Sequence, residues 1–168
     1  MSQKKRVVVS GGFDPLHIGH IRMMKEARNL GDYLTVILNN NHWLLDKKGF
    51  VFMDEKERKE ILLEFPFVDE VVISSHKKGD TDRSVSRELE YLKPHIFANG
   101  GDRNEIDAKN PDSSLYKDIQ TCQTNGIKIV FGVGHGGKVQ SSSWLVEAVR
   151  SQSDRSFFKR VFNWLRNE

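Results

Sequence analysis

Residues 6–20 of this 168-residue chain read RVVVSGGFDPLHIGH. The β-branched run Arg6–Ser10 predicts a buried strand, which Gly11 and Gly12 end in a tight turn. The apolar residues that follow recur near helical spacing, so we expect a helix that ends at Gly31 in a left-handed cap. A strand that turns directly into a helix indicates an α/β fold.

The same alternation continues along the rest of the chain. The interval 39–53 is expected to be a polar loop, and Asp54 and Glu57 have the spacing of a helix capping box. Further strands are expected at 33–38, 70–74, 95–98 and 127–131, with helices at 54–64, 84–92, 112–123 and 143–150. This spacing predicts an α/β fold with a Rossmann-like, doubly wound parallel five-stranded sheet, covered by helices on both faces.

Ligands of such sheets bind beyond the carboxyl ends of the strands. This rule brings four segments to one surface, at 11–20, 39–49, 100–105 and 132–143. They hold the glycines, histidines, paired lysines and clustered serines that stand out in the sequence. We therefore expect the ligand site there.

Two histidines give the first of these segments its chemistry. His17 and His20 lie in the first turn of the expected helix and project from one face. The free N–H groups and the dipole of a helix N-terminus favour an anion, and Gly19 leaves room for a bulky charged ligand. Imidazole donors can meet the negative charge that develops on a phosphoryl oxygen during displacement. The segment therefore predicts a polyphosphate site.

Residues 12–20 resemble the GxFDxxHxGH motif of the cytidylyltransferase-like nucleotidyltransferases, the superfamily with HIGH-type phosphate sites. The resemblance covers about residues 6–149. Segments 31–34 and 58–72 look like glycerol-3-phosphate cytidylyltransferase, whereas 92–102 is nearer the adenylyltransferase domain that activates heptose phosphate. The resemblance implies that an acceptor phosphate attacks the nucleotide α-phosphorus and that pyrophosphate leaves without a covalent enzyme intermediate.

The resemblance also implies catalytic roles for individual residues. His17 and His20 match the two histidines that bind phosphate and stabilise the transition state. Either Lys47 or Lys48 matches the loop lysine that neutralises the phosphates, and the sequence does not decide between them. Arg58 matches an arginine whose planar donor group suits phosphate, with a surface arginine on a charged helix as the alternative.

Other positions match the nucleotide-binding part of the family's site. Asp102 matches an acidic position used near the nucleotide, with a turn residue as its alternative. The family often has an arginine-containing run before its late Ser/Thr motif, whereas this chain offers Lys138 there. Asp14 is also expected to cap backbone N–H groups. The expected nucleotide-binding residues are Gly11, Gly12, Phe13, Asp14, Gly19, Asp102, Lys138, Ser141, Ser142 and Ser143.

Two other classes of function stay open at this point. The segment 132–139 almost fits the P-loop pattern G-x-x-x-x-G-K-[ST] of kinases and NTPases, but Val139 has no hydroxyl for magnesium. A non-catalytic module that binds nucleotide or RNA is the second alternative, because HIGH-type sites also occur in class I aminoacyl-tRNA synthetases. A chain of 168 residues leaves little room for a tRNA-binding domain.

The charge of the chain is concentrated at its end. Of 26 Lys and Arg and 23 Asp and Glu, five bases and two acids lie in 150–168, which accounts for the net +3. The rest of the chain, residues 1–149, has no net charge, which argues against nucleic-acid binding. The apolar residues of 154–168 fall on one sector of a helix. We therefore expect a nucleotidyltransferase domain at 1–150 and, at 151–168, a basic amphipathic helix that docks on protein or contacts anionic lipid.

Several further expectations follow from composition and chemistry. The single cysteine, Cys122, and the absence of a signal-peptide core favour a cytoplasmic protein. Mg²⁺ is expected as a cofactor, because the charge of a triphosphate must be neutralised for in-line attack; no protein metal ligands are expected. The predicted enzyme is a homodimer that transfers a nucleotidyl group from CTP, or alternatively ATP, to a small phosphorylated alcohol or sugar.

Overall fold

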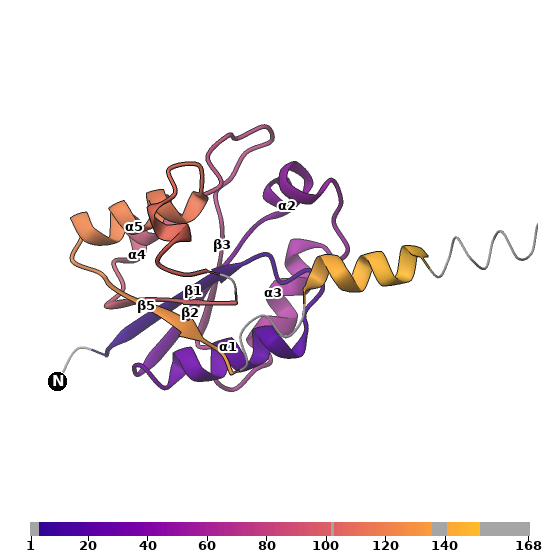
Figure 1. The fold of residues 1–168 in the computed structure, drawn as a ribbon. Helices are drawn as coiled ribbons and strands as arrows, with labels where there is room; N and C mark the ends of the chain where they lie inside the picture. The colour runs from indigo at the N-terminus through magenta and orange to yellow at the C-terminus, as the bar shows by residue number, and fades with distance from the viewer. Residues whose placement is uncertain (1–3, 102, 136–140, 152–168) are drawn as a thin grey trace, which may run out of the picture.

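The computed structural model describes residues 4–101, 103–135 and 141–151. Five parallel strands form one sheet in the order β3-β2-β1-β4-β5 (Figure 1). All five lie at the positions expected from the sequence, and the Rossmann-like fold is confirmed. The strands are β1 (Arg6–Gly11), β2 (Tyr33–Leu38), β3 (Glu70–Ile73), β4 (Ile96–Gly100) and β5 (Lys128–Val133).

Helices cover both faces of the sheet. Helices α1 and α3 pack on one face, and α4 and α5 pack on the other (Figure 1). Residues 142–151 are also helical. The bounds of the others are α1 (Ile18–Arg28), α2 (Asn41–Lys48), α3 (Glu55–Leu63), α4 (Ser86–Leu92) and α5 (Ser114–Thr124), with a short 3-10 turn η1 (Asp107–Lys109).

The central strand explains the two cores. Side chains of a strand alternate between the faces of the sheet, and Val7 and Val9 join the core under α1 and α3. Val8 joins the core under α4 and α5. All three valines are fully buried. Because both faces of β1 are covered, its middle is an unbroken apolar run, from Val7 to Val9, without alternating polar residues.

The expected polar loop at 39–53 is wrong, because it contains helix α2. The Asn40 side chain caps the helix by accepting a hydrogen bond from the Trp43 N–H at 3.0 Å, and Gly49 ends it with a left-handed φ of 76°. Trp43 and Leu44 are buried. These two residues and the exposed Leu45 form one apolar run among polar residues, so the segment lacks helical periodicity.

The left-handed cap expected at Gly31 is also wrong. Helix α1 ends at Arg28 and its C-cap, Asn29, has a right-handed conformation. Gly31 is required for a different reason: a Cβ there would lie 2.5 Å from the carbonyl oxygen of Lys5. The glycine lets the turn after α1 pass close to the start of β1.

The capping box expected at Asp54 is confirmed. The Asp54 carboxylate accepts a hydrogen bond from Lys56 N–H at 2.9 Å, and Glu57 accepts one from Asp54 N–H at 3.1 Å. The amphipathic tail expected at 151–168 lies outside the described residues except for residue 151. Within the described ranges, none of the helices has both the length and the apolar character needed to cross a membrane.

Candidate active site

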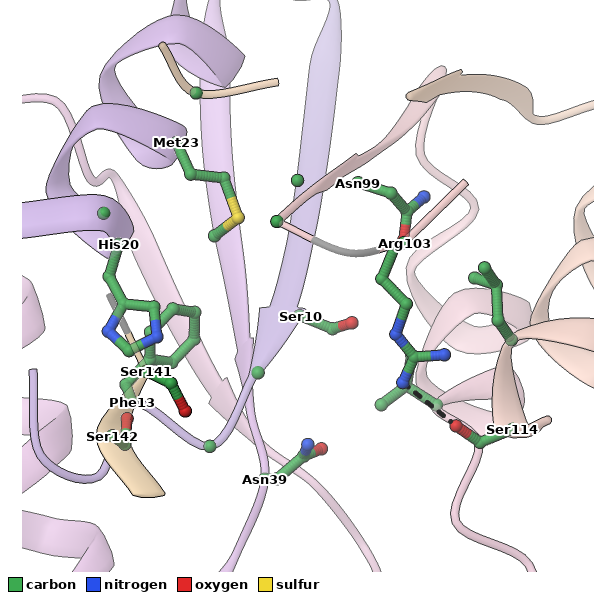
Figure 2. A pocket seen from close by; sticks show the side chains of 18 of the residues that line it. Ser10, Phe13, His20, Met23, Asn39, Asn99, Arg103, Ser114, Ser141 and Ser142 are labelled. Carbon is green, nitrogen blue, oxygen red and sulfur yellow. Dashed lines mark hydrogen bonds between the residues drawn. The ribbon is translucent and has the colours of Figure 1, made fainter. Parts of the chain in front are cut away.

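The strand order reverses between β1 and β4, and a cavity of about 400 Å³ opens at their carboxyl ends. We call it the central cavity. The ends of these two strands, the N-terminus of α1, residues 141–143 and parts of α2 and α5 line it. His20, Phe13, Ser141 and Ser142 lie on one side of it, and Arg103 and Ser114 lie on the other (Figure 2). The site is therefore at the switch point where open α/β sheets bind ligands.

The two histidines form a stacked pair at the start of α1. Their ring centroids lie 3.6 Å apart, and the backbone N–H of His17 donates to Nδ1 of His20 at 3.4 Å. Burial, followed by the neighbouring His17 and Lys48, lowers the pKa of His20 to about 3. Burial and Lys48 also lower the pKa of His17. His20 is therefore neutral near pH 7, and with Nδ1 as acceptor its proton lies on Nε2, a donor without positive charge.

Phe13 fixes the orientation of this pair. Its ring meets that of His20 edge to face at 4.9 Å, and it is 2% exposed. The backbone of Phe13 has a φ of 50°, which non-glycine residues adopt with strain. A Cβ on Gly11 would lie 3.1 Å from the Phe13 ring. The glycine therefore lets the phenylalanine fold back under the histidine.

Asp14 joins the histidine segment to the chain before α3. It is fully buried, and its carboxylate accepts hydrogen bonds from Phe52 N–H at 2.7 Å and Met53 N–H at 2.8 Å. The expectation that Asp14 binds backbone N–H groups is confirmed, although they belong to a distant segment. Asp14 is absent from the described lining of the central cavity.

Arg58 is fully buried beside Asp14 and does not line the central cavity. Its guanidinium donates to the carbonyl oxygens of Gly12 at 2.6 Å, Asn39 at 2.8 Å and Met53 at 2.9 Å, and to Oδ1 of Asn41 at 2.8 Å. Burial lowers its pKa, while Asp14, Glu55 and Asp54 raise it. The structure thus places Arg58 between the loops that follow β1 and β2, where it holds them together.

Both lysines of α2 line the central cavity. The Lys48 ammonium donates to the carbonyl oxygen of Asp14 at 3.2 Å, and burial lowers its pKa. The Lys47 ammonium lies 4.5 Å from the centre of the Trp43 ring. Lys48 is therefore the lysine that acts on the histidines, whose pKa values it lowers, while Lys47 lies over the Trp43 ring.

Residues 141–143 bring a second helix start to the cavity. All three serines line it, and the Ser142 hydroxyl donates to the carbonyl oxygen of Pro15 at 2.9 Å. The N-termini of α1 and of the helix at 142–151 therefore meet at one place. Each presents N–H groups that favour an anion.

Three buried polar atoms at the cavity have no hydrogen-bond partner among the described residues: Nδ1 of His17, Oδ1 of Asn39 and Nδ2 of Asn99. All three residues line the central cavity. A buried polar atom without a partner is costly, so these positions suit a polar ligand. Asn39 and Asn99 were not among the site residues expected from the sequence, although their place at the ends of β2 and β4 was a usable signal.

A family model described as cytidylyltransferase-like matches residues 8–130 of the chain. The chain belongs to this family. It is 39% identical over 152 residues to an FAD synthase of Thermococcus sibiricus, a match that covers 89% of this chain and 96% of that relative. It is 33% identical over 129 residues to the bifunctional protein HldE of Geobacter metallireducens, covering 76% of this chain and 24% of that relative.

Solved structures show the same architecture. A lipopolysaccharide core biosynthesis protein from Thermoplasma volcanium is 29% identical, with a TM-score of 0.58 and coverage of 79% of this chain and 99% of that one. TmcAL of Thermotoga maritima, 14% identical, reaches a TM-score of 0.64 over 89% of this chain and 51% of its own. At 14% identity, the likeness to TmcAL concerns the fold alone.

As a cytidylyltransferase-like protein, the chain is a nucleotidyltransferase. This membership favours the first interpretation of the sequence over the P-loop alternative. Of the expected site residues, the structure brings together Gly11, Gly12, Phe13, His17, Gly19, His20, Lys47, Lys48, Ser141, Ser142 and Ser143 around the central cavity. Asp102 and Lys138 lie outside the described residues.

The cytidylyltransferase-like site offers few ligands for a metal ion. In the described ranges, no group of three or more His, Cys, Asp or Glu side chains is placed to hold one. The described lining of the central cavity includes one carboxylate, that of Asp118. These residues do not form a protein cage for Mg²⁺, and they fit a cation whose main ligands are substrate phosphates.

Proposed function

We propose that the protein transfers the adenylyl group of ATP to the phosphate of a small phosphorylated acceptor, with release of pyrophosphate. The observation that carries the proposal is the stacked pair of His17 and His20 at the junction of two helix N-termini. ATP is preferred to CTP because FAD is an adenylyl ester, and FAD synthase is the name of a relative that matches nearly the whole chain. CTP remains the alternative.

In the proposed reaction an acceptor phosphate oxygen forms a bond to the α-phosphorus as the bond to the bridging oxygen of pyrophosphate breaks. Negative charge grows on the oxygens around the α-phosphorus and on the leaving group. The Nε2–H of neutral His20 and the ring of His17 donate to these oxygens. Lys48 and the Ser141–Ser143 segment neutralise and bind the phosphates. No proton needs to leave the acceptor, because its phosphate is already ionised.

Mg²⁺ belongs to this proposal as a cation carried by the triphosphate. When bound, it neutralises phosphate charge and favours pyrophosphate as a leaving group. The residues that would approach the phosphates with it are His17, His20, Lys47 and Lys48, all cavity-lining. We propose in addition that the protein is a homodimer. Light scattering of the full chain tests this oligomeric state directly.

The acceptor to test first is FMN, whose adenylylation yields FAD. Glycerol 3-phosphate and a heptose phosphate are the alternatives, the second because HldE is a relative. Pyrophosphate release is measured for ATP and CTP with each acceptor. We expect the highest rate with ATP, and a loss of about 10²-fold or more in kcat for His17→Ala and His20→Ala. Undiminished activity in both variants would contradict the assigned site.

A further inference from the structure

A second, more polar space adjoins the central cavity. This outer cleft, of about 780 Å³, lies between α2, the 81–83 segment, η1 and the start of α5. Lys47, Arg83, Arg103 and Ser114 line both spaces. Arg103 is held there by Asp107 at 3.1 Å and by Ser114 at 3.2 Å (Figure 2). The two spaces therefore share a fixed, cationic junction.

The size of the central cavity indicates that the outer cleft takes part in substrate binding. Its volume of about 400 Å³ is near the lower end of the range of about 300–1000 Å³ for sites of single ligands. A nucleotidyl transfer needs two substrates bound at once. The triphosphate is assigned to the side of His20 and Ser141–Ser143. The second substrate then lies on the side of Arg103.

Asp118 on α5 is the carboxylate that lines the central cavity on this side. It is 5% exposed, and Val85 N–H donates to its Oδ1 at 2.7 Å. Within the described residues, no donor to its Oδ2 is found. Val85 and Leu115, both buried, provide apolar walls next to it. The carboxyl group is thus fixed in place with one oxygen available for a ligand.

The negative charge of an ionised Asp118 is poorly compensated by the charged groups around it. Burial raises the pKa of Asp118 to about 7; Val85 N–H and Arg103 oppose the shift, and Asp82 and Glu88 add to it. Asp82 is itself paired with Lys117, and Glu88 accepts hydrogen bonds from Ser75. A buried carboxyl group in these surroundings gains from a donor supplied by a ligand.

On the basis of the proposed function, we propose that Asp118 determines acceptor specificity by binding an N–H or O–H donor on the organic part of the acceptor. That part of the acceptor extends past Arg103 into the outer cleft. The acceptor class is a phosphomonoester longer than a three-carbon chain, with polar donors on its body. A ring with an imide N–H, as in FMN, meets this description, and glycerol 3-phosphate does not.

Binding measurements test this without catalysis. The full chain and the variants Asp118→Ala, Asp118→Asn and Glu90→Gln are titrated with FMN and with glycerol 3-phosphate, in the presence of α,β-methylene-ATP. Glu90 is an exposed residue of α4 that lines neither space, so its variant controls for the loss of one negative charge. Affinity for the ATP analogue alone is measured for every protein.

We expect FMN affinity to fall about tenfold or more in both Asp118 variants, as for the loss of one buried hydrogen bond. It should stay within about twofold in Glu90→Gln, as should the affinity for the ATP analogue in all variants. FMN that binds Asp118→Ala as tightly as wild type, or does not bind wild type, overturns the inference. So does a joint loss of FMN and ATP-analogue binding.

The same proteins separate this inference from the proposed function. Asp118-dependent FMN binding without any pyrophosphate release counts against the proposed function and leaves the acceptor assignment standing. Transfer to FMN with an unchanged KM for FMN in Asp118→Ala supports the function and overturns the role of Asp118.

Discussion

At the scale of single residues, the site depends on groups that are held in one protonation state and one orientation. His20 is packed by Phe13 on its edge and stacked on His17. Such a ring is a donor that needs no reorganisation when charge appears on a phosphate. Its neutrality also matters, because two adjacent imidazolium ions beside Lys48 would repel one another. Burial and electrostatics therefore both favour the neutral ring.

The first prediction concerns the charge of His20. We expect its imidazole to remain neutral, with the proton on Nε2, from pH 8 down to about pH 5, because burial, His17 and Lys48 lower its pKa to about 3. Nitrogen-15 NMR of the rings reports both tautomer and charge. The exposed His42 is the internal reference for an accessible histidine. A His20 signal that titrates near pH 6.5 would show that the ring is not buried as described.

The second prediction concerns stability and Asp118. Its pKa is raised from 3.8 to about 7 in the folded protein. Between these values the unfolded chain releases the proton that the folded protein keeps, so this group's contribution to stability is present below pH 4 and lost as the pH rises through 7. The Tm of Asp118→Asn minus that of wild type should therefore increase from pH 4 to pH 8. The same difference for Glu90→Gln should be flat.

At the scale of elements, the loops after β1 and β2 are fixed by buried polar groups. Arg58 on α3 bonds to Gly12 and Asn39, which follow those two strands, and Asp14 binds the chain at 52–53. Helix α2 brings its lysines to the cavity between these loops. A buried polar network of this kind gives the histidine segment one defined position, because each carbonyl would otherwise lose its partner.

The third prediction follows from this network. Arg58→Met keeps much of the side-chain volume but leaves three carbonyl oxygens without their donor. We expect a loss of about 3 kcal/mol or more in the free energy of unfolding, measured by urea denaturation. Lys56→Met, at an exposed position of the same helix, should change it by less than about 0.5 kcal/mol. Stability within that margin for Arg58→Met would show that the network is dispensable.

At the scale of the whole molecule, the strand order sets where the two proposed substrate sides lie at the carboxyl edge of the sheet. The helices at 18–28 and 142–151 meet at the phosphate side of the cavity, while α5 borders the proposed acceptor side. The switch between β1 and β4 brings these sides within one site. In the proposed reaction the acceptor oxygen then faces the α-phosphorus on the side opposite the pyrophosphate leaving group, as in-line displacement requires.

The fourth prediction concerns the basic tail, whose two assignments from sequence are docking on protein and contact with anionic lipid. The lipid assignment predicts that the full chain floats with vesicles containing anionic phospholipid and that a chain ending at residue 152 does not. Added salt should weaken flotation, since it screens the attraction of Lys and Arg to the surface. If neither protein floats with the vesicles, the lipid assignment is wrong and docking on protein is the assignment that remains.

The alternation of strands and helices could be read from the sequence because each element carries its own pattern. The strand at 6–11 and the capping box at Asp54 depend on neighbouring residues alone. Helix α2 was not predicted because its apolar residues, Trp43, Leu44 and Leu45, are consecutive and do not give a helical period. The cap expected at Gly31 was wrong because the need for glycine there is not local. The carbonyl oxygen of Lys5, from the start of the chain, lies too close to leave room for a side chain.

By itself, the sequence determined the histidine motif and the strand that leads to it, because these depend on residue types at fixed short spacing. The resemblance of that motif to a known family implied the class of reaction. The tertiary structure decided which groups meet. It brought Asn39, Asn99 and Asp118 to the cavity and placed Arg58 in the interior among carbonyl groups. Burial, partners and pKa depend on contacts between residues far apart in the chain, and such contacts exist only once the sheet has assembled.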